Sequence, residues 1–506
     1  MHAPSTRLRP LVSELTPWRP ASEASLQKLA RTMHGLDKGV GTNLRSLIEH
    51  EPAELADHEL SSLPAGYVYF AQFVAHDLSL QPADGFECAR PSPRTFELDL
   101  DSLYGAGPLA HPHLYDRGDP RRIALVRGAG EGVYVQFDVM RNSAGLACIE
   151  DARNDQNVLV SQIHVAVARA HNALVGACER FPELTEHGPH SVFQAARLLT
   201  TWLYQWVVAN DWLARILDPV LVQRLEKGVA AYATRVFGKD PARLTPEFCF
   251  AAGRFGHALV RPKYRLNAWV PPLPIVPWGE QPPHAHLMAH HALHRDWFLD
   301  LRMFLELSAA QTARVEQLRG ALLPALAVDK SDQVQRARRL KPRFTRRMTL
   351  MPVPPGEPSD LRMMALRSLA AGVAAGLPSG SDLAKKLDLP QEFEPDQPLL
   401  VSVLEEAERV HKGERLGEFG SRLVGDTLIG ALQIDRASIA HVADFRPSSF
   451  SAEREPFDLA ELLLLGDGDA AALAAWVERC GFTAPLARQL KAWNPRSGRP
   501  GRPPST

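Results

Sequence analysis

Apolar residues recur every three to four positions along most of the chain, which predicts a mainly helical protein. The segment 64–78 places Gln72 and His76 on one face of such a helix, four positions apart. The segment 157–180 predicts a long amphipathic helix. Further helices are expected at 191–216, 246–260, 284–308, 311–327, 361–375, 400–411, 418–434 and 469–479.

Strand signals are few, and the clearest lies at 122–137. Two β-rich runs flank a Gly-rich turn that contains Gly128, Gly130 and Gly132. A dinucleotide-binding loop requires a strand, a turn and then a helix, whereas a second strand-like run follows here. The pattern therefore predicts a hairpin.

The composition, with 45% hydrophobic and 23% charged residues, is that of an ordinary globular protein. The informative motifs are spread along most of the chain, so one large domain is expected over 26–489. The segment 1–25 is expected to be flexible, and the Pro/Gly/Arg-rich tail 490–506 to be disordered. A net charge of −1 gives no electrostatic case for a nucleic-acid or membrane-surface partner.

The five cysteines are scattered and form no CxxC pair, which argues against a disulfide framework or a zinc ribbon. They are Cys88, Cys148, Cys178, Cys249 and Cys480. The first residues lack an apolar signal core, and no apolar run of 18 residues is apparent. We therefore expect no secretory signal, no membrane span and a cytoplasmic location, while secretion by a route without an N-terminal signal stays open.

Gln72 and His76 form a polar pair on the inner face of an otherwise apolar helix. Such a pair must be hydrogen-bonded or functional, and a satisfied core histidine is the plainer interpretation. Asp77 points about a third of a turn away, toward different surroundings.

The segment FAQFVAHDLSL resembles the distal-histidine helix of animal-type haem peroxidases, the cyclooxygenase–peroxidase superfamily. The resemblance implies a mainly α, peroxidase-like helical domain with few short strands. It also implies that Gln72 contacts halide or water, that His76 is the acid–base catalyst, and that Asp77 is a calcium ligand.

The segment TFELDLDSLYG at 95–105 alternates oxygen-bearing side chains, as a hard cation requires, although an acidic strand edge would look similar. The resemblance to the family implies one Ca²⁺ site here. Its implied ligands are Asp77, Thr95, the Glu97 carbonyl, Asp99 and Asp101.

The segment DARNDQNVLVSQIHVAVARAHNAL resembles the part of the family that carries the catalytic arginine, and this resemblance assigns that role to Arg153. A guanidinium keeps its charge at any working pH, so it can stabilise a departing hydroxide. His164 and His171 lie on one helix face and are interpreted as structural.

The segment FCFAAGRFGHALVRP is rich in small residues, and Gly253 and Gly256 would weaken a helix. Both glycines make sense if a flat group approaches the backbone closely. The segment resembles the family's proximal element, which implies that His257 binds the haem iron and that Arg254 reaches a haem propionate.

Three positions depart from the family pattern. Ala75 and Gln156 stand where mammalian members carry the Asp and Glu that form ester bonds to the haem. We therefore expect haem b held non-covalently. Ser368 stands where the family has an Asn that binds the proximal histidine.

The segment HAHLMAHHALH at 284–294 is the remaining histidine cluster. On a helix, His286 and His290, or His290 and His294, could grip a metal at i,i+4 spacing. No acidic partner and no HExxH pattern accompany them, so a partly exposed helix face is the plainer interpretation.

Together these motifs predict a haem peroxidase that reduces hydrogen peroxide and oxidises a small organic, halide or pseudohalide donor. One alternative is a haem-dependent fatty-acid dioxygenase, but those relatives carry a Tyr three residues before the proximal histidine, where this chain has Arg254. A second alternative is a non-catalytic haem-binding module, which would need neither His76 nor Arg153. The oligomeric state stays open.

Overall fold

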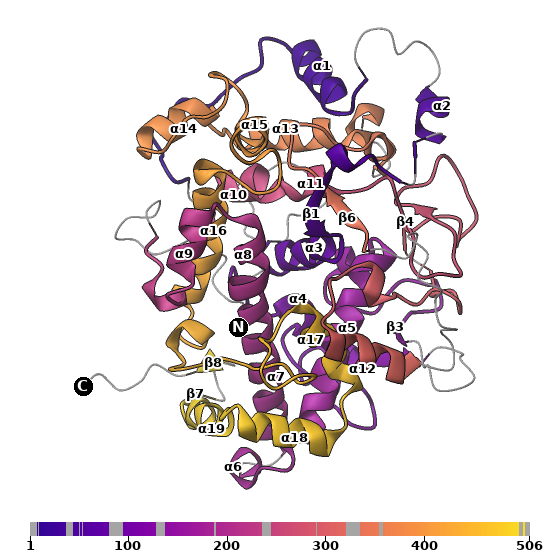
Figure 1. Cartoon of the computed structure of the whole chain (residues 1–506), viewed down its shortest axis with the longest axis vertical. Coiled ribbons are helices and arrows are strands. Elements are labelled where there is room, and N and C mark those ends of the chain that lie inside the picture. The colour runs from indigo at the N-terminus through magenta and orange to yellow at the C-terminus, as the bar shows by residue number, and fades with distance from the viewer. Residues whose placement is uncertain are drawn as a thin grey trace.

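Helices build most of the computed structural model (Figure 1). It describes residues 8, 10–36, 44–49, 51–52, 54–79, 95–127, 137–186, 189–234, 244–289, 291–319, 334–353, 358–494 and 499–500. The α-helices are α1 (Glu23–Met33), α2 (Leu44–Glu49), α3 (Gly66–Leu78), α4 (Asp101–Tyr104), α5 (Val158–Cys178), α6 (Pro182–Thr185), α7 (Pro189–Trp206), α8 (Leu213–Ile216), α9 (Pro219–Leu225), α10 (Pro246–Phe250), α11 (Gly256–Leu259), α12 (Ala309–Arg319), α13 (Met364–Ala374), α14 (Gly380–Lys386), α15 (Leu399–His411), α16 (Glu418–Ile434), α17 (Leu459–Leu464), α18 (Ala470–Arg479) and α19 (Thr483–Lys491).

The strands are short and pair antiparallel in twos: β1 (Leu60–Pro64) with β6 (Arg336–Arg338), β2 (Leu125–Arg127) with β3 (Phe137–Val139), β4 (Lys263–Tyr264) with β5 (Leu273–Pro274), and β7 (Trp493–Asn494) with β8 (Arg499–Pro500). The pairing of β2 with β3 confirms the predicted hairpin, whose glycines Gly128, Gly130 and Gly132 lie outside the described residues. The expectation of a mainly helical chain with few short strands is confirmed.

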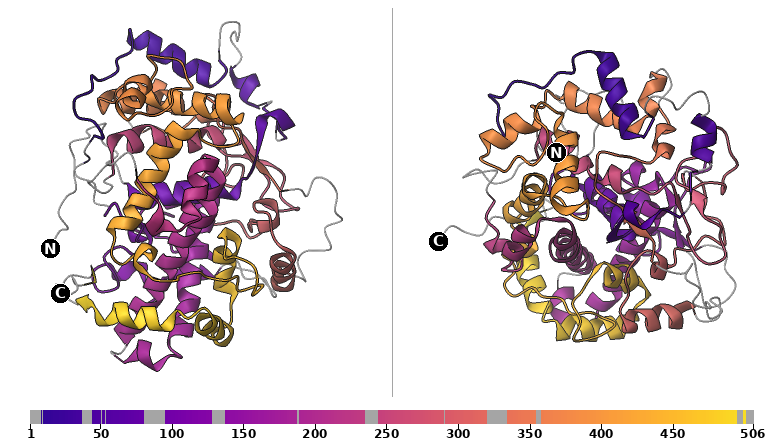
Figure 2. Two further views of the ribbon diagram at one scale, coloured as in Figure 1. Left: turned by 60° about the vertical axis from the view of Figure 1, so that its left-hand side comes forward. Right: turned by 45° about the horizontal axis from the view of Figure 1, so that its top comes forward.

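Helix α5 is the central element of the core. Asn157 caps its first turn by accepting a hydrogen bond from the Val160 backbone N–H at 3.0 Å. Helices α3, α7, α17 and α18 pack around it. Figure 2 shows α18 and α19, in yellow, across one end of the molecule.

Among the described helices, α5 alone is long and apolar enough by composition to cross a bilayer. Most of its apolar stretch is buried inside the protein, as in the core helix of a folded domain. The sequence analysis expected no apolar run of 18 residues, and this stretch of α5 differs from that expectation.

The predicted helix at 246–260 is interrupted. Thr245 caps α10, and the chain leaves helical geometry at Ala251 before a 3₁₀ turn and then α11. A Cβ at Gly253 would lie 2.9 Å from the Phe248 carbonyl oxygen, so only glycine permits this tight turn. Helix α11 therefore begins as a separate short element, with Gly256 and His257 on the cavity and Ala258 and Leu259 buried.

The predicted helix over 284–308 is wrong. Residues 284–289 form an irregular segment in which Leu287 accepts a hydrogen bond from Val158, and Ala289 donates one to Gln156. Pairing with these distant segments replaces local helical hydrogen bonds. His290 lies outside the described residues, so the predicted metal-binding pairs that include it are not described. The other predicted helices agree with the structure to within a few positions, and residues 320–327 of the helix predicted at 311–327 also lie outside the described residues.

Four cysteines have free thiols in the described part of the chain: Cys148, Cys178, Cys249 and Cys480. Cys88 lies outside it. The expectation of no disulfide framework agrees with these four thiols, while the proposed domain limits stay a prediction.

Candidate functional site: a cavity between two histidines

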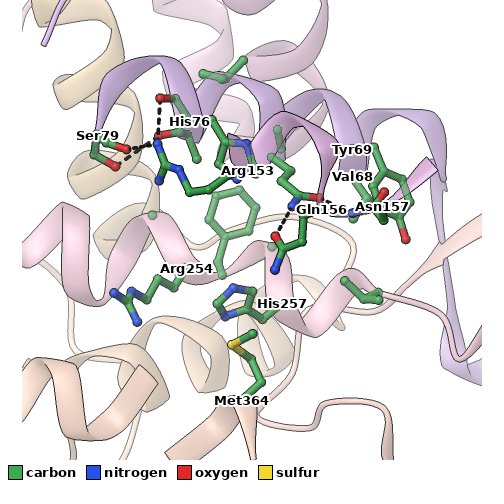
Figure 3. Close-up of a pocket in the computed structure, with 18 of the residues that line it drawn as sticks. Val68, Tyr69, His76, Ser79, Arg153, Gln156, Asn157, Arg254, His257 and Met364 are labelled. Atoms are coloured by element: carbon green, nitrogen blue, oxygen red, sulfur yellow. Dashed lines mark hydrogen bonds between the residues drawn. The ribbon is translucent and has the colours of Figure 1, made fainter. Parts of the chain in front are cut away.

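A cavity of about 460 Å³ lies between α3 on one side and α10, α11 and α13 on the other. His76 and Arg153 line one wall, and His257 and Arg254 line the opposite wall (Figure 3). Gln72 also faces the cavity. The fold thus brings together five residues that the sequence singled out on segments far apart in the chain.

His76 is held by a short polar network. Its Nδ1 lies 2.9 Å from Asn154 Oδ1, and Asn154 Nδ2 lies 3.3 Å from His164 Nδ1. Burial lowers the pKa of His164 to about 4, so this ring is neutral and its Nδ1 can accept from the Asn154 amide. The Asn154 oxygen then accepts from His76 Nδ1–H, which leaves Nε2 as the basic nitrogen of His76.

Arg153 is oriented by its own turn of chain. Its guanidinium forms an ion pair with Asp151 at 2.7 Å and donates to the carbonyl oxygens of His76 at 3.0 Å and Ser79 at 2.5 Å. The Asp151 side chain is buried, and it also accepts from the backbone N–H of Arg153. A permanent positive charge is therefore fixed beside the backbone of His76.

Gln72 is clamped by two neighbouring amides. Its Nε2 donates to Gln156 Oε1 at 3.1 Å, and its Oε1 accepts from Asn157 Nδ2 at 3.2 Å. Because Asn157 also caps α5, the same residue joins the start of the core helix to the distal wall.

His257 lies on α11, on the opposite wall. Its Nδ1 is 3.3 Å from Ser368 Oγ, the contact expected from the sequence, and its ring meets Phe344 edge to face. Burial lowers the pKa of His257 to about 3, with further lowering by Arg254 and Arg367. The ring is therefore neutral, as a metal ligand must be, with Nε2 left unused by Ser368.

Two guanidinium groups line the proximal side. Arg254 donates from Nε to the Cys249 carbonyl oxygen at 3.0 Å and forms no ion pair with any described residue. Burial lowers its pKa to about 10, and neighbouring Arg367 adds to this. Arg367, which sequence reasoning missed, donates to the carbonyl oxygens of Leu361 and Pro352. Two cations at one cavity wall suit a ligand that carries carboxylates.

The cavity walls fit a flat, largely apolar group. Most lining side chains are apolar, and no Asp or Glu occurs among the described residues that line it. A Cβ at Gly256 would meet nothing within 4 Å, so the α11 backbone faces open space there. The paired histidines, the open backbone and the two cations together suit a haem with propionates.

The acidic loop lies beyond the distal helix. Asp77, Asp99 and Asp101 bring one carboxylate oxygen each to within 4.8 Å of one another, so this cluster could bind a metal. Thr95 donates to Asp99 from Oγ1 at 3.0 Å and to Asp101 from its backbone N–H at 3.2 Å. Glu97 donates its backbone N–H to Thr95 Oγ1.

Asp77 ties this loop to α3. It accepts from the backbone N–H of Leu100 at 3.1 Å and from Ser102 Oγ at 3.1 Å. Burial raises the pKa of Asp77 to about 7, and the neighbouring Asp99 adds to this. A cation would relieve that repulsion.

Residues 129–299 match the family model described as Animal haem peroxidase, a region that includes Arg153 and His257. The match covers about a third of the chain and makes this region similar to the animal haem peroxidase family. A peroxidase-like protein from Margaritifera margaritifera is 30% identical over 118 residues, which cover 22% of this chain and only 14% of that relative.

One solved structure shares the fold at low sequence identity, and a second is more weakly similar. A fatty acid alpha-dioxygenase from Arabidopsis thaliana superimposes with a TM-score of 0.51 at 13% identity, over 99% of this chain and 82% of the dioxygenase. Peroxidase A from Dictyostelium discoideum gives a TM-score of 0.47 at 16% identity, over 86% of this chain and 92% of that protein. The likeness to the dioxygenase concerns the fold alone.

Proposed function

We propose that the chain is a haem peroxidase that reduces hydrogen peroxide and oxidises a small organic, halide or pseudohalide donor. The observation that carries this proposal is one cavity with His76 and Arg153 on one wall and His257 on the other. A pocket that only binds the cofactor would need His257 but would not need His76 and Arg153 on the opposite wall.

His257 would hold the haem b iron through Nε2, with Arg254 and Arg367 facing the propionates. When bound there, haem would provide the redox chemistry, namely two electrons for peroxide that the donor would return one at a time. Ser368 fixes the His257 ring from the other side.

The distal residues supply proton transfer and charge. His76 Nε2 takes the proton from one peroxide oxygen and returns it to the other, which leaves as water. Arg153 stabilises the negative charge that develops on the leaving oxygen. Gln72, held by Gln156 and Asn157, orients water or a small anion beside them.

Replacing His76 tests the proposal. His76→Ala should lower peroxide-dependent oxidation of a phenolic donor roughly 100- to 10,000-fold and leave haem bound, as the absorption spectrum reports. His58, an exposed histidine, provides the control, and His58→Ala should turn over like the wild type. Turnover retained in His76→Ala would refute the assignment.

Fatty-acid dioxygenation is the alternative activity of the same fold. Arg254 stands where dioxygenases of the superfamily carry the hydrogen-abstracting Tyr, which favours the peroxidase. Oxygen consumption with a polyunsaturated or saturated fatty acid, without added peroxide, would support the dioxygenase instead. A protein that binds haem but performs neither reaction would be a non-catalytic haem-binding module.

We also propose that the acidic cluster holds Ca²⁺, with Asp77, Asp99 and Asp101 as carboxylate ligands and Thr95 and the Glu97 carbonyl completing the set. Carboxylates, a hydroxyl and a carbonyl are hard oxygen ligands of the kind that Ca²⁺ prefers. Since Asp77 directly follows His76, the ion would fix the end of the distal helix.

A further inference from the structure

The irregular segments 284–289 and 291–297 gather histidine rings that the proposed peroxidase reaction does not use. The ring centroids of His284 and His291 are 4.6 Å apart, those of His284 and His294 are 4.9 Å apart, and those of His286 and His291 are 6.4 Å apart. The buried Trp297 packs against His284 at 5.2 Å. The sequence suggested metal binding only through helical spacing, whereas the structure clusters the rings without a helix.

Hydrogen bonds to one carbonyl fix the protonation of two rings. His284 Nε2 and His291 Nδ1 lie 3.1 and 3.0 Å from the Ala292 carbonyl oxygen. A carbonyl oxygen only accepts, so both of these nitrogens carry hydrogen. In the neutral rings, the lone pairs therefore reside on His284 Nδ1 and His291 Nε2. Donation from the far nitrogen to a carbonyl is the arrangement that orients a metal-binding histidine.

Two ring nitrogens of this cluster are buried without a hydrogen-bond partner. His291 Nε2 and His286 Nδ1 are both buried atoms without a hydrogen bond. Leaving such nitrogens unsatisfied is costly, and a bound cation would satisfy them.

We infer that His284, His286 and His291 form a binding site for a divalent first-row transition cation. Three imidazoles select Zn²⁺, Ni²⁺ or Cu²⁺ over Ca²⁺ and Mg²⁺, which require oxygen ligands. With Zn–N bonds of about 2.0–2.1 Å, imidazole rings on one tetrahedral ion have centroids roughly 5 Å apart. The observed separations of 4.6 and 6.4 Å lie on either side of this value.

Binding requires the half-exposed rings to rotate. Among the described residues, only the Asp77 cluster already has three ligand atoms converging within 4.8 Å. All three histidines are partly exposed and lie on irregular chain, so the rings can turn while His284 and His291 keep their bonds to the Ala292 carbonyl. The site is distinct from both the haem cavity and the acidic cluster.

The segment nevertheless connects with the distal wall. Met288 lines the cavity and forms a β-bridge with Asn157, which clamps Gln72. A cation held by the histidines would therefore fix the chain directly behind the distal amides.

Calorimetric titration of Zn²⁺ into the haem-loaded full chain, with Ca²⁺ saturating, tests the inference. We expect one equivalent to bind at the histidines. His284→Ala should lower the affinity for that equivalent of Zn²⁺ at least tenfold. His291→Asn should do the same, because Asn keeps a donor for the Ala292 carbonyl but lacks the Nε2 lone pair. His58→Ala, the exposed control, should leave it unchanged.

Electron paramagnetic resonance with Cu²⁺ provides a second measurement that is independent of peroxidase turnover. Nitrogen hyperfine structure that is lost in His291→Asn would support imidazole ligation. The inference is overturned if the wild type binds no zinc equivalent. It is equally overturned if the double variant His284→Ala/His291→Asn, with an unchanged circular dichroism spectrum, binds zinc as the wild type does.

Discussion

At the scale of single residues, Asn154 decides which nitrogen of His76 is basic. Its oxygen accepts from His76 and its amide nitrogen donates to His164, so the amide cannot turn over without losing both contacts. We therefore regard Asn154 as a positioning residue for the proposed proton transfer. Removal of a group that orients a metal-binding histidine typically costs 10- to 100-fold in activity, and we expect a comparable cost for this orienting contact.

Asn154→Ala should accordingly lower kcat/KM for peroxide by about 10- to 100-fold, with the haem spectrum retained. Asn154→Asp keeps an acceptor for His76 and adds negative charge, which favours the imidazolium. Its acid limb of activity should therefore move to higher pH, a shift that a purely structural role would not produce. Stopped-flow measurements across pH would detect both effects, and kcat/KM within twofold of the wild type in Asn154→Ala would contradict this role.

Among the described residues, no carboxylate lines the cavity wall, which predicts how the haem is held. Ala75 and Gln156 both line the cavity, and the Gln156 amide is engaged by Gln72. Acidified organic solvent should extract all of the haem, because no ester can form. Haem that remained on the protein in denaturing chromatography, after turnover with peroxide, would contradict non-covalent binding.

Residues that stand in a local sequence motif could be singled out from the sequence. Residues whose contacts are with distant parts of the chain could not. His76, Arg153 and His257 each stand in a recognisable segment. Asn154 bonds a residue 78 positions away, and Arg367 approaches the cavity from α13, so neither has a local pattern that reveals its role. Asn154 could have been noticed only as a polar residue next to Arg153 in a buried turn.

At the scale of elements, the acidic loop and α3 meet through Asp77. Its carboxylate bonds Leu100 and Ser102 on the loop, while the preceding residue faces the cavity. Chelation of Ca²⁺ should therefore loosen the distal helix as well as the loop. Loss of a ligand present at 100 times its Kd costs about 2.7 kcal/mol of stability.

We expect EGTA to lower the Tm and peroxidase activity together, and Ca²⁺ but not Mg²⁺ to restore both. Asp99→Asn should abolish this response, whereas Glu392→Gln, a change at an exposed acid, should preserve it. Differential scanning calorimetry with and without chelator measures the effect. If EGTA does not change the Tm of the wild type, the proposal that the acidic cluster binds Ca²⁺ is wrong.

Helices with a continuous apolar stripe were predictable, and segments fixed by distant partners were not. α3 and α5 follow their pattern because the stripe faces the core along their whole length. The segment 284–308 has enough apolar residues for a helix, but Leu287 pairs with Val158 and Pro274 instead. Tertiary hydrogen bonding overrides local propensity there.

At the scale of the whole molecule, buried titratable groups determine how stability varies with pH. Burial lowers the pKa of His34, His164 and His171 to about 4, so these groups make the fold more stable as pH rises from 4 to 6.5. Burial raises the pKa of Glu247 and Glu406 to about 7, which acts in the opposite direction. A single variant can separate the second contribution from the first.

Glu247 is suited to that test because it joins distant parts of the chain. Its Oε1 accepts from the Leu11 backbone N–H at 3.1 Å, while Oε2 is buried without a hydrogen bond. Between pH 4.5 and 7 the folded protein keeps the proton that the unfolded chain releases. The contribution of Glu247 to stability is therefore complete below pH 4.5 and is lost as pH rises through 7.

Glu247→Gln keeps the acceptor for Leu11 and removes the titration. The variant should match the wild type near pH 4.5 and be more stable by roughly 3–4 kcal/mol above pH 8, since each unit of pKa shift corresponds to about 1.4 kcal/mol. Denaturant unfolding of both proteins at a series of pH values gives this difference. Because the histidines are common to both proteins, their opposing contribution cancels, and a difference that did not grow with pH would show that Glu247 is ionised in the folded state at neutral pH.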